Sequence, residues 1–138
     1  MTNLAVNLAV EDVRLSVDWY SKLLNCHSPM EQEHPHRKLF DLILDENNNT
    51  IVIFSQWGHN KLKPLANKSH EFTGLGVHLF FEVENINQSW ENANDLKVDI
   101  LHKLHKSRGF NNLEFTVMDR DGYYVTISEK NKTLPNRT

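Results

Sequence analysis

Apolar and polar positions alternate along the N-terminal half of this chain in a pattern that predicts one helix among three strands. Residues 4–10 are mostly apolar and few, as in a buried strand. Asp12 can cap a following helix, and its apolar stripe consists of Val13, Val17, Tyr20 and Leu24. Residues 38–44 and the β-branched run 50–56 flank an Asn-rich turn and predict a hairpin. The half is therefore expected to be β-α-β-β, with room for one more short strand near Met30.

The C-terminal half repeats this plan after a polar connector, residues 57–73. Asn85 can cap a helix, and Gln88 three residues later is close to a capping box. Strands are expected over 76–83, 98–104, 113–118 and 123–129. The phrase VEDVRLS at 10–16 returns as VENINQS at 83–89, an offset of 73 residues. A repeat of this length indicates two copies of one supersecondary unit.

Side chains of a strand alternate between its two faces, so position sorts them. In the first strand Val6, Leu8 and Val10 form a uniformly apolar set, which should lie beneath the helix. The other set is Ala5, Asn7 and Ala9. The repeat gives a mixed set in the same place: His78, Phe80 and Glu82. Chemistry is expected on the faces that carry the mixed sets.

Several motifs together resemble a known family. They are LAVED at 8–12, Trp19-Tyr20, LLN at 23–25, Glu114-Phe115 and the turn DRDG at 119–122. In this order they resemble the vicinal oxygen chelate superfamily, which includes glyoxalase I, bleomycin-resistance proteins and extradiol dioxygenases. The resemblance covers about residues 3–129. It implies an α+β fold of two tandem βαβββ modules that form a cupped mixed sheet, often assembled as a homodimer.

On this basis residues 1–130 are expected to be one domain, and 131–138 a polar tail. Module one spans about 3–56 and module two about 74–129. Metal-dependent members take one ligand from each of four equivalent strand positions. The resemblance places three of these at Ala5, His78 and Thr126, and the fourth near Phe54 or Ser55. Only His78 is a strong ligand type, and a catalytic ion generally needs about three.

The expected set of metal ligands is therefore incomplete, and no metal cofactor is predicted. His78 has three open interpretations: a histidine hydrogen-bonded to Glu114 or Thr126, a ligand contact, or one metal ligand among others. The last defines the alternative function, a metal-dependent lyase, isomerase or dioxygenase using His78 and a divalent ion. A metal-free enzyme with Glu82 or Glu114 as general base is a further alternative.

Aromatic and acidic residues suggest a site for a flat, cationic organic ligand. The candidate ligand-binding residues are His78, Phe80, Glu82, Glu114, Trp57, Tyr124, Thr126 and Phe54. The alternative is that the aromatics simply fill the interior, because pockets and cores look alike in one dimension. We predict a metal-independent small-molecule binding protein that holds its ligand in a cup between the modules.

Other candidate residues are weaker indications of function. The pairs His34/His36 and His102/His105 stand beside no Cys or carboxylate at metal-site spacing and are interpreted as surface histidines. Asp119 and Asp121 flank a hairpin glycine and are interpreted as turn formers. Nucleophile-elbow and phosphate-loop motifs are lacking.

Net charge, cysteine count and hydropathy limit the partners and the compartment that are expected for this protein. A net charge of −3 with scattered Lys and Arg argues against a nucleic-acid partner. The lone Cys26 excludes an internal disulfide framework, suits a reducing compartment and is interpreted as a small, half-buried thiol. The sequence lacks a leader pattern and an 18-residue apolar run, so a cytoplasmic protein without membrane contact is expected.

Overall fold

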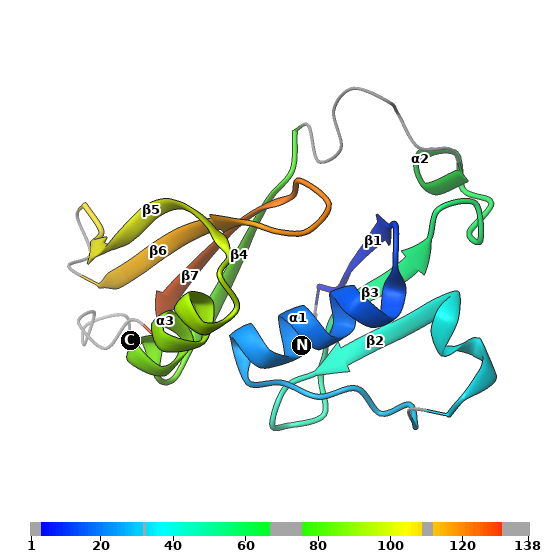
Figure 1. Cartoon of the computed structure of the whole chain (residues 1–138), viewed down its shortest axis with the longest axis horizontal. Coiled ribbons are helices and arrows are strands. Elements are labelled where there is room, and N and C mark those ends of the chain that lie inside the picture. The colour runs from blue at the N-terminus through cyan, green and yellow to red at the C-terminus, as the bar shows by residue number, and fades with distance from the viewer. Residues whose placement is uncertain (1–3, 32, 67–75, 109–111, 131–138) are drawn as a thin grey trace. The chain divides into compact units, whose positions relative to one another are not determined.

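The computed structural model describes residues 4–31, 33–66, 76–108 and 112–130. The chain forms two compact units, Met1–Glu71 and Phe72–Thr138, called here the N-terminal and C-terminal units. Their boundary falls within 57–73, and the expectation of one domain stays a prediction. Each unit combines a sheet with helices, so the predicted α+β class is confirmed (Figure 1). The predicted tail 131–138 lies outside the described residues.

The N-terminal unit holds a three-stranded sheet in the order β1-β3-β2. Its strands are β1 (Val6–Val10), β2 (Phe40–Leu44) and β3 (Thr50–Gln56), and its helices are α1 (Val13–Leu24), the 3-10 turn η1 (Pro35–Lys38) and α2 (Lys63–Ala66). β1 runs parallel to β3, and β2 pairs with β3 as the predicted hairpin. The extra strand expected near Met30 is reduced to one isolated bridge between His27 and Leu44.

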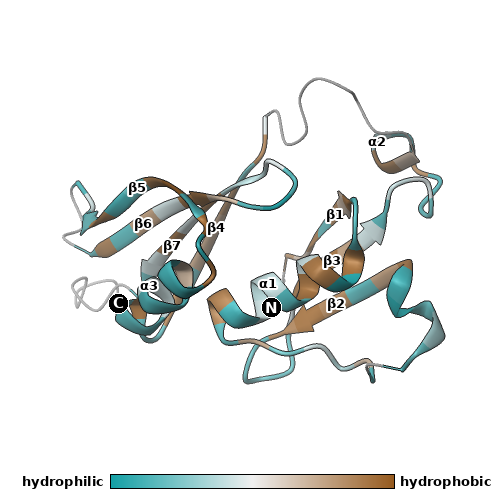
Figure 2. Ribbon diagram, viewed as in Figure 1, coloured by the Kyte–Doolittle hydropathy of each residue, from teal (hydrophilic) through white to brown (hydrophobic). Residues whose placement is uncertain are grey.

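Helix α1 forms where the sequence supplies both a cap and an apolar stripe. The Asp12 carboxylate accepts a hydrogen bond from the Leu15 N–H at 3.0 Å, and Asn25 ends the helix in the left-handed conformation at φ 57°. Tyr20 packs against Phe54 of β3 with ring centroids 5.3 Å apart. In Figure 2 the strands of this unit are largely hydrophobic and the turns that join them are hydrophilic. The helix therefore covers one face of the sheet and buries an apolar core.

The C-terminal unit has the predicted β-α-β-β-β order. Its elements are β4 (His78–Val83), α3 (Ile86–Asp95), β5 (Asp99–Lys106), β6 (Leu113–Met118) and β7 (Tyr124–Glu129). The strands form a four-stranded sheet in the order β4-β7-β6-β5, with β4 parallel to β7 and the remaining neighbours antiparallel. The Asn85 side chain caps α3 by accepting from the Gln88 N–H at 3.1 Å.

Helix α3 covers one face of this sheet. Trp90 meets Phe115 of β6 edge to face, with ring centroids 5.1 Å apart. Leu79, Val125 and Ile127 are buried and share that side. Because side chains alternate along each strand, residues of opposite parity, beginning with His78, lie on the other side. Among the described residues, no helix is long and apolar enough to cross a bilayer.

A buried ion pair ties η1 to β2 in the N-terminal unit. The Asp41 side chain is fully buried and accepts from Arg37 Nε at 2.9 Å, Ser28 Oγ at 2.6 Å and the Leu42 N–H at 2.7 Å. Arg37 Nη2 also reaches Asp18 at 3.2 Å, but that carboxylate is 60% exposed. The same guanidinium therefore has one buried partner and one solvated partner.

We expect Asp41→Asn to destabilise the protein by about 3–5 kcal/mol, because the substitution leaves the buried Arg37 without its buried counter-charge. Asp18→Asn is the matched control, and loss of this exposed partner should cost about 1 kcal/mol or less. Urea denaturation of the two variants measures the difference. Equal losses of stability would contradict the assignment of Asp41 as the principal partner.

Candidate functional site

We call the side of the C-terminal sheet that carries His78 the His78 face. Strand register assembles it in rows: His78 lies beside Tyr124 and Met118, Phe80 beside Thr126 and Thr116, and Glu82 beside Ser128 and Glu114. Six of the eight predicted ligand-binding residues are on this face: His78, Phe80, Glu82, Glu114, Tyr124 and Thr126. Residues more than 40 positions apart in sequence thus become neighbours through strand pairing alone.

A chain of hydrogen bonds crosses the centre of the His78 face. His78 Nε2 lies 2.7 Å from Thr126 Oγ1, and Thr126 Oγ1 lies 2.7 Å from Thr116 Oγ1. Of the interpretations of His78 left open by the sequence, the structure contains the hydrogen bond to Thr126. The buried Thr126 hydroxyl has both partners it needs, which satisfies a polar group that would otherwise be costly to bury.

Two aromatic side chains stand exposed on either side of this chain. Phe80 is 59% exposed and Tyr124 is 50% exposed. Phe80 contacts the His78 ring edge to face, with ring centroids 5.8 Å apart. Strand β7 also carries two small hydroxyl side chains on this face, Thr126 beside Phe80 and Ser128 beside Glu82, and both are buried. The face therefore presents exposed aromatic side chains next to small polar ones.

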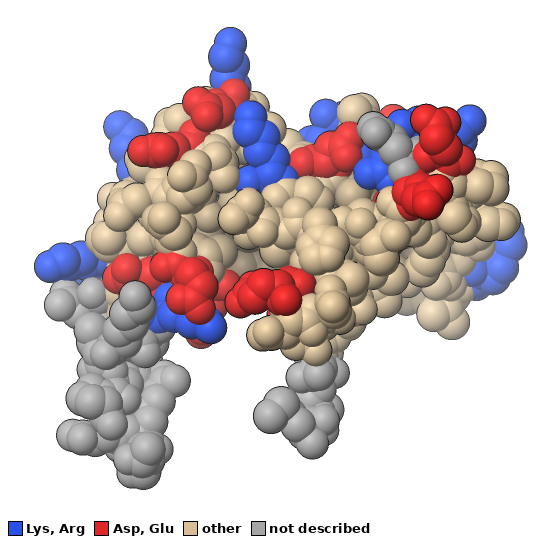
Figure 3. All heavy atoms as spheres, turned by 90° about the horizontal axis from the view of Figure 1, so that it is seen from below, with Lys and Arg blue, Asp and Glu red and all other residues tan. Residues whose placement is uncertain are grey.

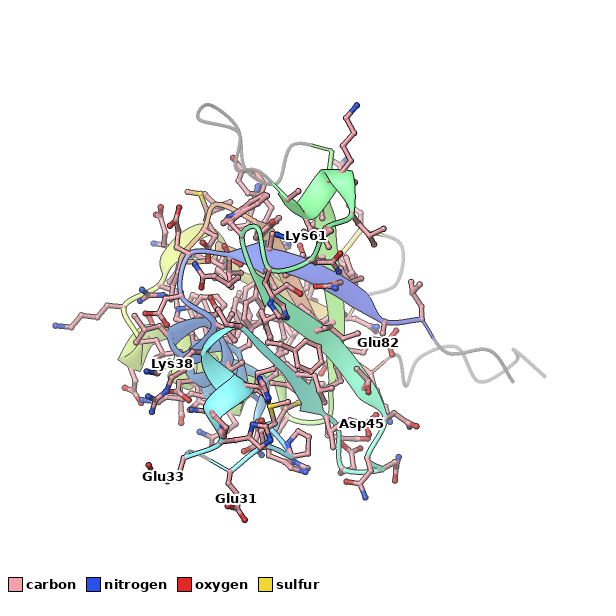
Figure 4. The ribbon with its side chains drawn as sticks, turned by 90° about the vertical axis from the view of Figure 1, so that its right-hand side faces the viewer. Glu31, Glu33, Lys38, Asp45, Lys61 and Glu82 are labelled. Atoms are coloured by element: carbon pink, nitrogen blue, oxygen red, sulfur yellow. The ribbon has the colours of Figure 1, made fainter. Side chains whose placement is uncertain are left out.

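Two carboxylates complete the face. Glu82 on β4 is exposed (Figure 4). Glu114 on β6 is partly exposed, and both residues lie beside Ser128 in the register. On the face of the molecule drawn in Figure 3, acidic and basic side chains are interspersed. The His78 face therefore combines aromatic surface, hydroxyl groups and negative charge.

Phe54, predicted as a ligand-binding residue, is placed by the structure in the core. It is fully buried, pairs with Leu8 in the register and packs on Tyr20 of α1. It therefore lies on the helix-covered face of the N-terminal sheet and is a core residue rather than a wall of a site. The proposed fourth ligand position is then better matched by Ser55, whose hydroxyl donates to Asn7 Oδ1 at 2.9 Å.

Trp57 directly follows β3 in the N-terminal unit. Its backbone N–H donates to the Val10 carbonyl at 3.3 Å, which extends the pairing with β1 by one residue. Its indole Nε1 is buried and has no hydrogen-bond partner within the described part of the chain. An indole N–H can only donate, so this atom suits an acceptor from water or a ligand. Trp57 is not part of the His78 face.

The residues at the family's metal positions do not fit an ion. Ala5 has no donor atom, and the Thr126 oxygen is shared between His78 and Thr116. No group of three or more His, Cys, Asp or Glu suited to a metal ion occurs among the residues that the structure describes. His78 alone falls short of the ligand number that a catalytic ion requires.

Thr116 and Ser128 are not among the ligand-binding residues predicted above. Alternation along β6 and β7 does place both on the side of the predicted residues, because each lies two positions from one of them. The pattern of residues in β5 does not predict its geometry, in which two irregularities interrupt the pairing with β6.

Comparisons with known proteins agree on the fold. A family model described as Glyoxalase/Bleomycin resistance protein/Dioxygenase superfamily matches residues 4–127. TioX from Micromonospora sp. ML1 superposes with a TM-score of 0.71 at 14% identity, covering 94% of this chain and 98% of that one. A protein of unknown function from Agrobacterium tumefaciens str. C58 gives 0.70 at 18% identity, with 94% of both chains covered.

A lactoylglutathione lyase from Agrobacterium tumefaciens gives a TM-score of 0.64 at 10% identity, with 94% of both chains covered. At these identities the similarity establishes the fold and no activity. A search among curated proteins finds no match.

Two weakly acidic side chains that are not candidate site residues, Cys26 and Tyr123, keep their protons near neutral pH. Burial, with Asp45 and Glu46 nearby, raises the pKa of the Cys26 thiol from 9.0 to about 11. Burial, with Asp119 and Asp121, raises the pKa of Tyr123 from 10.0 to about 12. Asp119 Oδ1 accepts the N–H groups of Asp121 and Tyr123 at 2.8 Å, the predicted turn role. Neither acid is prepared to act as a nucleophile or base near neutral pH.

Alkylation of Cys26 by iodoacetamide at pH 8 should be about 100-fold slower than that of a free model thiol, because the raised pKa lowers the thiolate fraction by that factor. Mass spectrometry of the intact chain follows the reaction at this single cysteine. The rate should recover in guanidinium chloride. Equal rates in the folded and unfolded chain would contradict the shifted pKa.

Proposed function

The chain belongs to the Glyoxalase/Bleomycin resistance protein/Dioxygenase superfamily, and we propose that it is a metal-independent binding protein for a small organic ligand. Its site includes the His78 face of the C-terminal unit. The observation that carries the proposal is the pair of exposed aromatics, Phe80 and Tyr124, on the face that also carries the Thr126 and Ser128 hydroxyl groups. Exposed aromatic surface of this kind is costly in water and is a common mark of a binding site.

The chemistry of the face favours a flat, cationic ligand. Phe80 and Tyr124 offer π-faces for stacking and for attraction of a positive charge. Glu82 and Glu114 supply negative charge on the same side of the sheet. Hydroxyls of Thr116 and Ser128 can orient polar groups of the ligand, and His78 adds a hydrogen-bonding edge. This combination of apolar surface with a few polar groups is typical of small-molecule sites.

Binding without a metal ion is supported by the donor set. The family's metal positions hold Ala5 and the doubly hydrogen-bonded Thr126, which are not ion ligands. The alternative, a metal-dependent enzyme using His78, draws on one correctly placed residue and on the fold shared with a lactoylglutathione lyase. Fold alone does not carry an activity from one family member to another.

The cationic aromatic dye ethidium, followed by its fluorescence, tests the ligand class. We expect ethidium to bind more tightly than the anionic dye 8-anilinonaphthalene-1-sulfonate. Phe80→Ala and Glu82→Gln should each weaken ethidium binding about tenfold, in the range of cation–π and desolvated charge interactions. Equal affinity for the two dyes, or no ethidium binding, would contradict a cationic aromatic ligand.

Glu84→Gln is the matched control for Glu82→Gln. Glu84 lies two residues further along, and its carboxylate pairs with Lys130 at 2.7 Å. Leu15→Ala removes a side chain on α1 that is 45% exposed, in the other unit, and controls for loss of apolar surface. Both controls should leave ethidium affinity within twofold. A general loss in all four variants would point to nonspecific dye binding.

Removal of metal ions separates the two functions. Treatment with ethylenediaminetetraacetate should leave ethidium affinity within twofold, because the proposed contacts are made by side chains alone. If affinity falls on chelation and returns on addition of Zn²⁺ or Mn²⁺, and His78→Ala abolishes that return, the metal-dependent alternative replaces this proposal.

A further inference from the structure

Strand β5 contains a bulge that aligns two histidines. His102 lies opposite Thr116 and His105 lies opposite Glu114 in the register with β6. The chain advances three residues on β5 for two on β6, and the register shifts between these pairs. In a regular strand, residues three apart point to opposite faces, but one extra residue restores the same side. His102 and His105 therefore share the side that carries Thr116 and Glu114.

Their ring geometry agrees with this placement. The two imidazole centroids lie 6.3 Å apart with an interplanar angle of 51°. Both residues are exposed, so neither ring is held by core packing. With metal–nitrogen bonds of about 2.0–2.1 Å, two imidazoles on one ion hold their centroids about 5–6 Å apart. The observed separation of 6.3 Å is close to this range, so the spacing of the pair is compatible with one shared ion.

One hydrogen bond fixes the tautomer of His105. Its Nδ1 lies 2.6 Å from the Lys103 carbonyl oxygen. A carbonyl can only accept, so Nδ1 carries the hydrogen and Nε2 of the neutral ring keeps its lone pair. Histidines that bind metals are commonly oriented in this way, with the second ring nitrogen donating to a backbone carbonyl. His105 Nε2 is therefore available as a metal ligand in the metal-free protein.

We propose that His102 and His105 together bind one divalent transition-metal ion of the class that prefers imidazole, such as Zn²⁺, Ni²⁺ or Cu²⁺. Two side chains supply the protein ligands, and solvent or a small molecule supplies the rest. The Glu114 carboxylate opposite His105 adds negative charge at the site. With two protein ligands the ion is exchangeable, unlike an ion in a closed structural site.

The His102/His105 pair lies on the same side of the sheet as His78 but at the opposite edge. β5 and β4 are the two edges of the four-stranded sheet, with β7 and β6 between them. At the usual spacing of neighbouring strands, β5 and β4 are about 14 Å apart. An ion at His102 and His105 is therefore too far from His78 to take it as a ligand, while Thr116 and Glu114 of the His78 face lie beside the pair in the register.

The chain supplies its own matched control. His34 and His36 also form a close pair, with centroids 5.5 Å apart. However, His34 Nδ1 accepts the backbone N–H of His36 at 3.2 Å, so its lone pair is already used and its hydrogen is on Nε2. This second pair has similar spacing but the opposite tautomer, and the proposal assigns it no ion.

Isothermal titration of the full, chelator-treated chain with Zn²⁺ tests the proposal. We expect one site whose affinity falls at least tenfold in His102→Gln and in His105→Gln. The double variant His34→Gln/His36→Gln and the single variant His78→Gln should bind Zn²⁺ within twofold of the parent chain. Because His102 and His105 are exposed, thermal unfolding without metal should be unchanged by their replacement.

Zn²⁺ should also raise the unfolding temperature of the parent chain, and this rise should vanish in His102→Gln, because an ion stabilises only the form that binds it. Unchanged Zn²⁺ affinity in both His102→Gln and His105→Gln would overturn the proposal. Loss of binding in the His34/His36 variant, or in His78→Gln alone, would overturn it as well. Since no outcome depends on ethidium, failure here leaves the proposed ligand site standing.

Discussion

The parallel pairing of β4 with β7 determines which side chains of the C-terminal unit act together. Because residues beside each other in the register point the same way, pairing His78 with Tyr124 also puts Phe80 beside Thr126 and Glu82 beside Ser128. A slip of one residue would turn Phe80, His78 and Glu82 under α3 and expose Leu79 and Phe81. Apolar packing of Leu79 and Val125 beneath the helix therefore protects the register. The chemistry of the His78 face rests on that packing.

Much of this arrangement follows from the sequence. The repeat at 10–16 and 83–89 marks two helix starts, and both Asp12 and Asn85 cap helices in the structure. The bounds predicted for β3 and β6 match the observed ones. On β4 the sequence alternates strongly between apolar and mixed residues, so parity alone assigns His78, Phe80 and Glu82 to one side. Alternation succeeds wherever the two faces of a strand differ in polarity.

Alternation fails where the two faces of a strand have the same polarity. β3 is apolar on both faces through Ile51, Val52, Ile53 and Phe54, so its pattern does not tell which side meets α1. The sequence predicts Phe54 as an aromatic ligand-binding residue, and its contact with Tyr20 places it in the core instead. The bulge in β5 leaves no local mark either, since it arises from pairing with β6. Arg37 is buried, which is unusual for a charged residue, because the buried Asp41 carboxylate on β2 neutralises its charge. This ion pair exists only once β2 has formed, so the sequence alone does not predict it.

The hydroxyl of Thr126 can donate only one hydrogen, and this makes the line from His78 to Thr116 directional. When His78 Nε2 holds a lone pair, Thr126 donates to it and receives from Thr116, which then presents only oxygen lone pairs outward. When Nε2 carries a hydrogen, Thr126 turns to donate to Thr116, whose own O–H is released to point outward. The tautomer of one imidazole thus switches the Thr116 hydroxyl, two strands away, between acceptor and donor without any movement of the backbone.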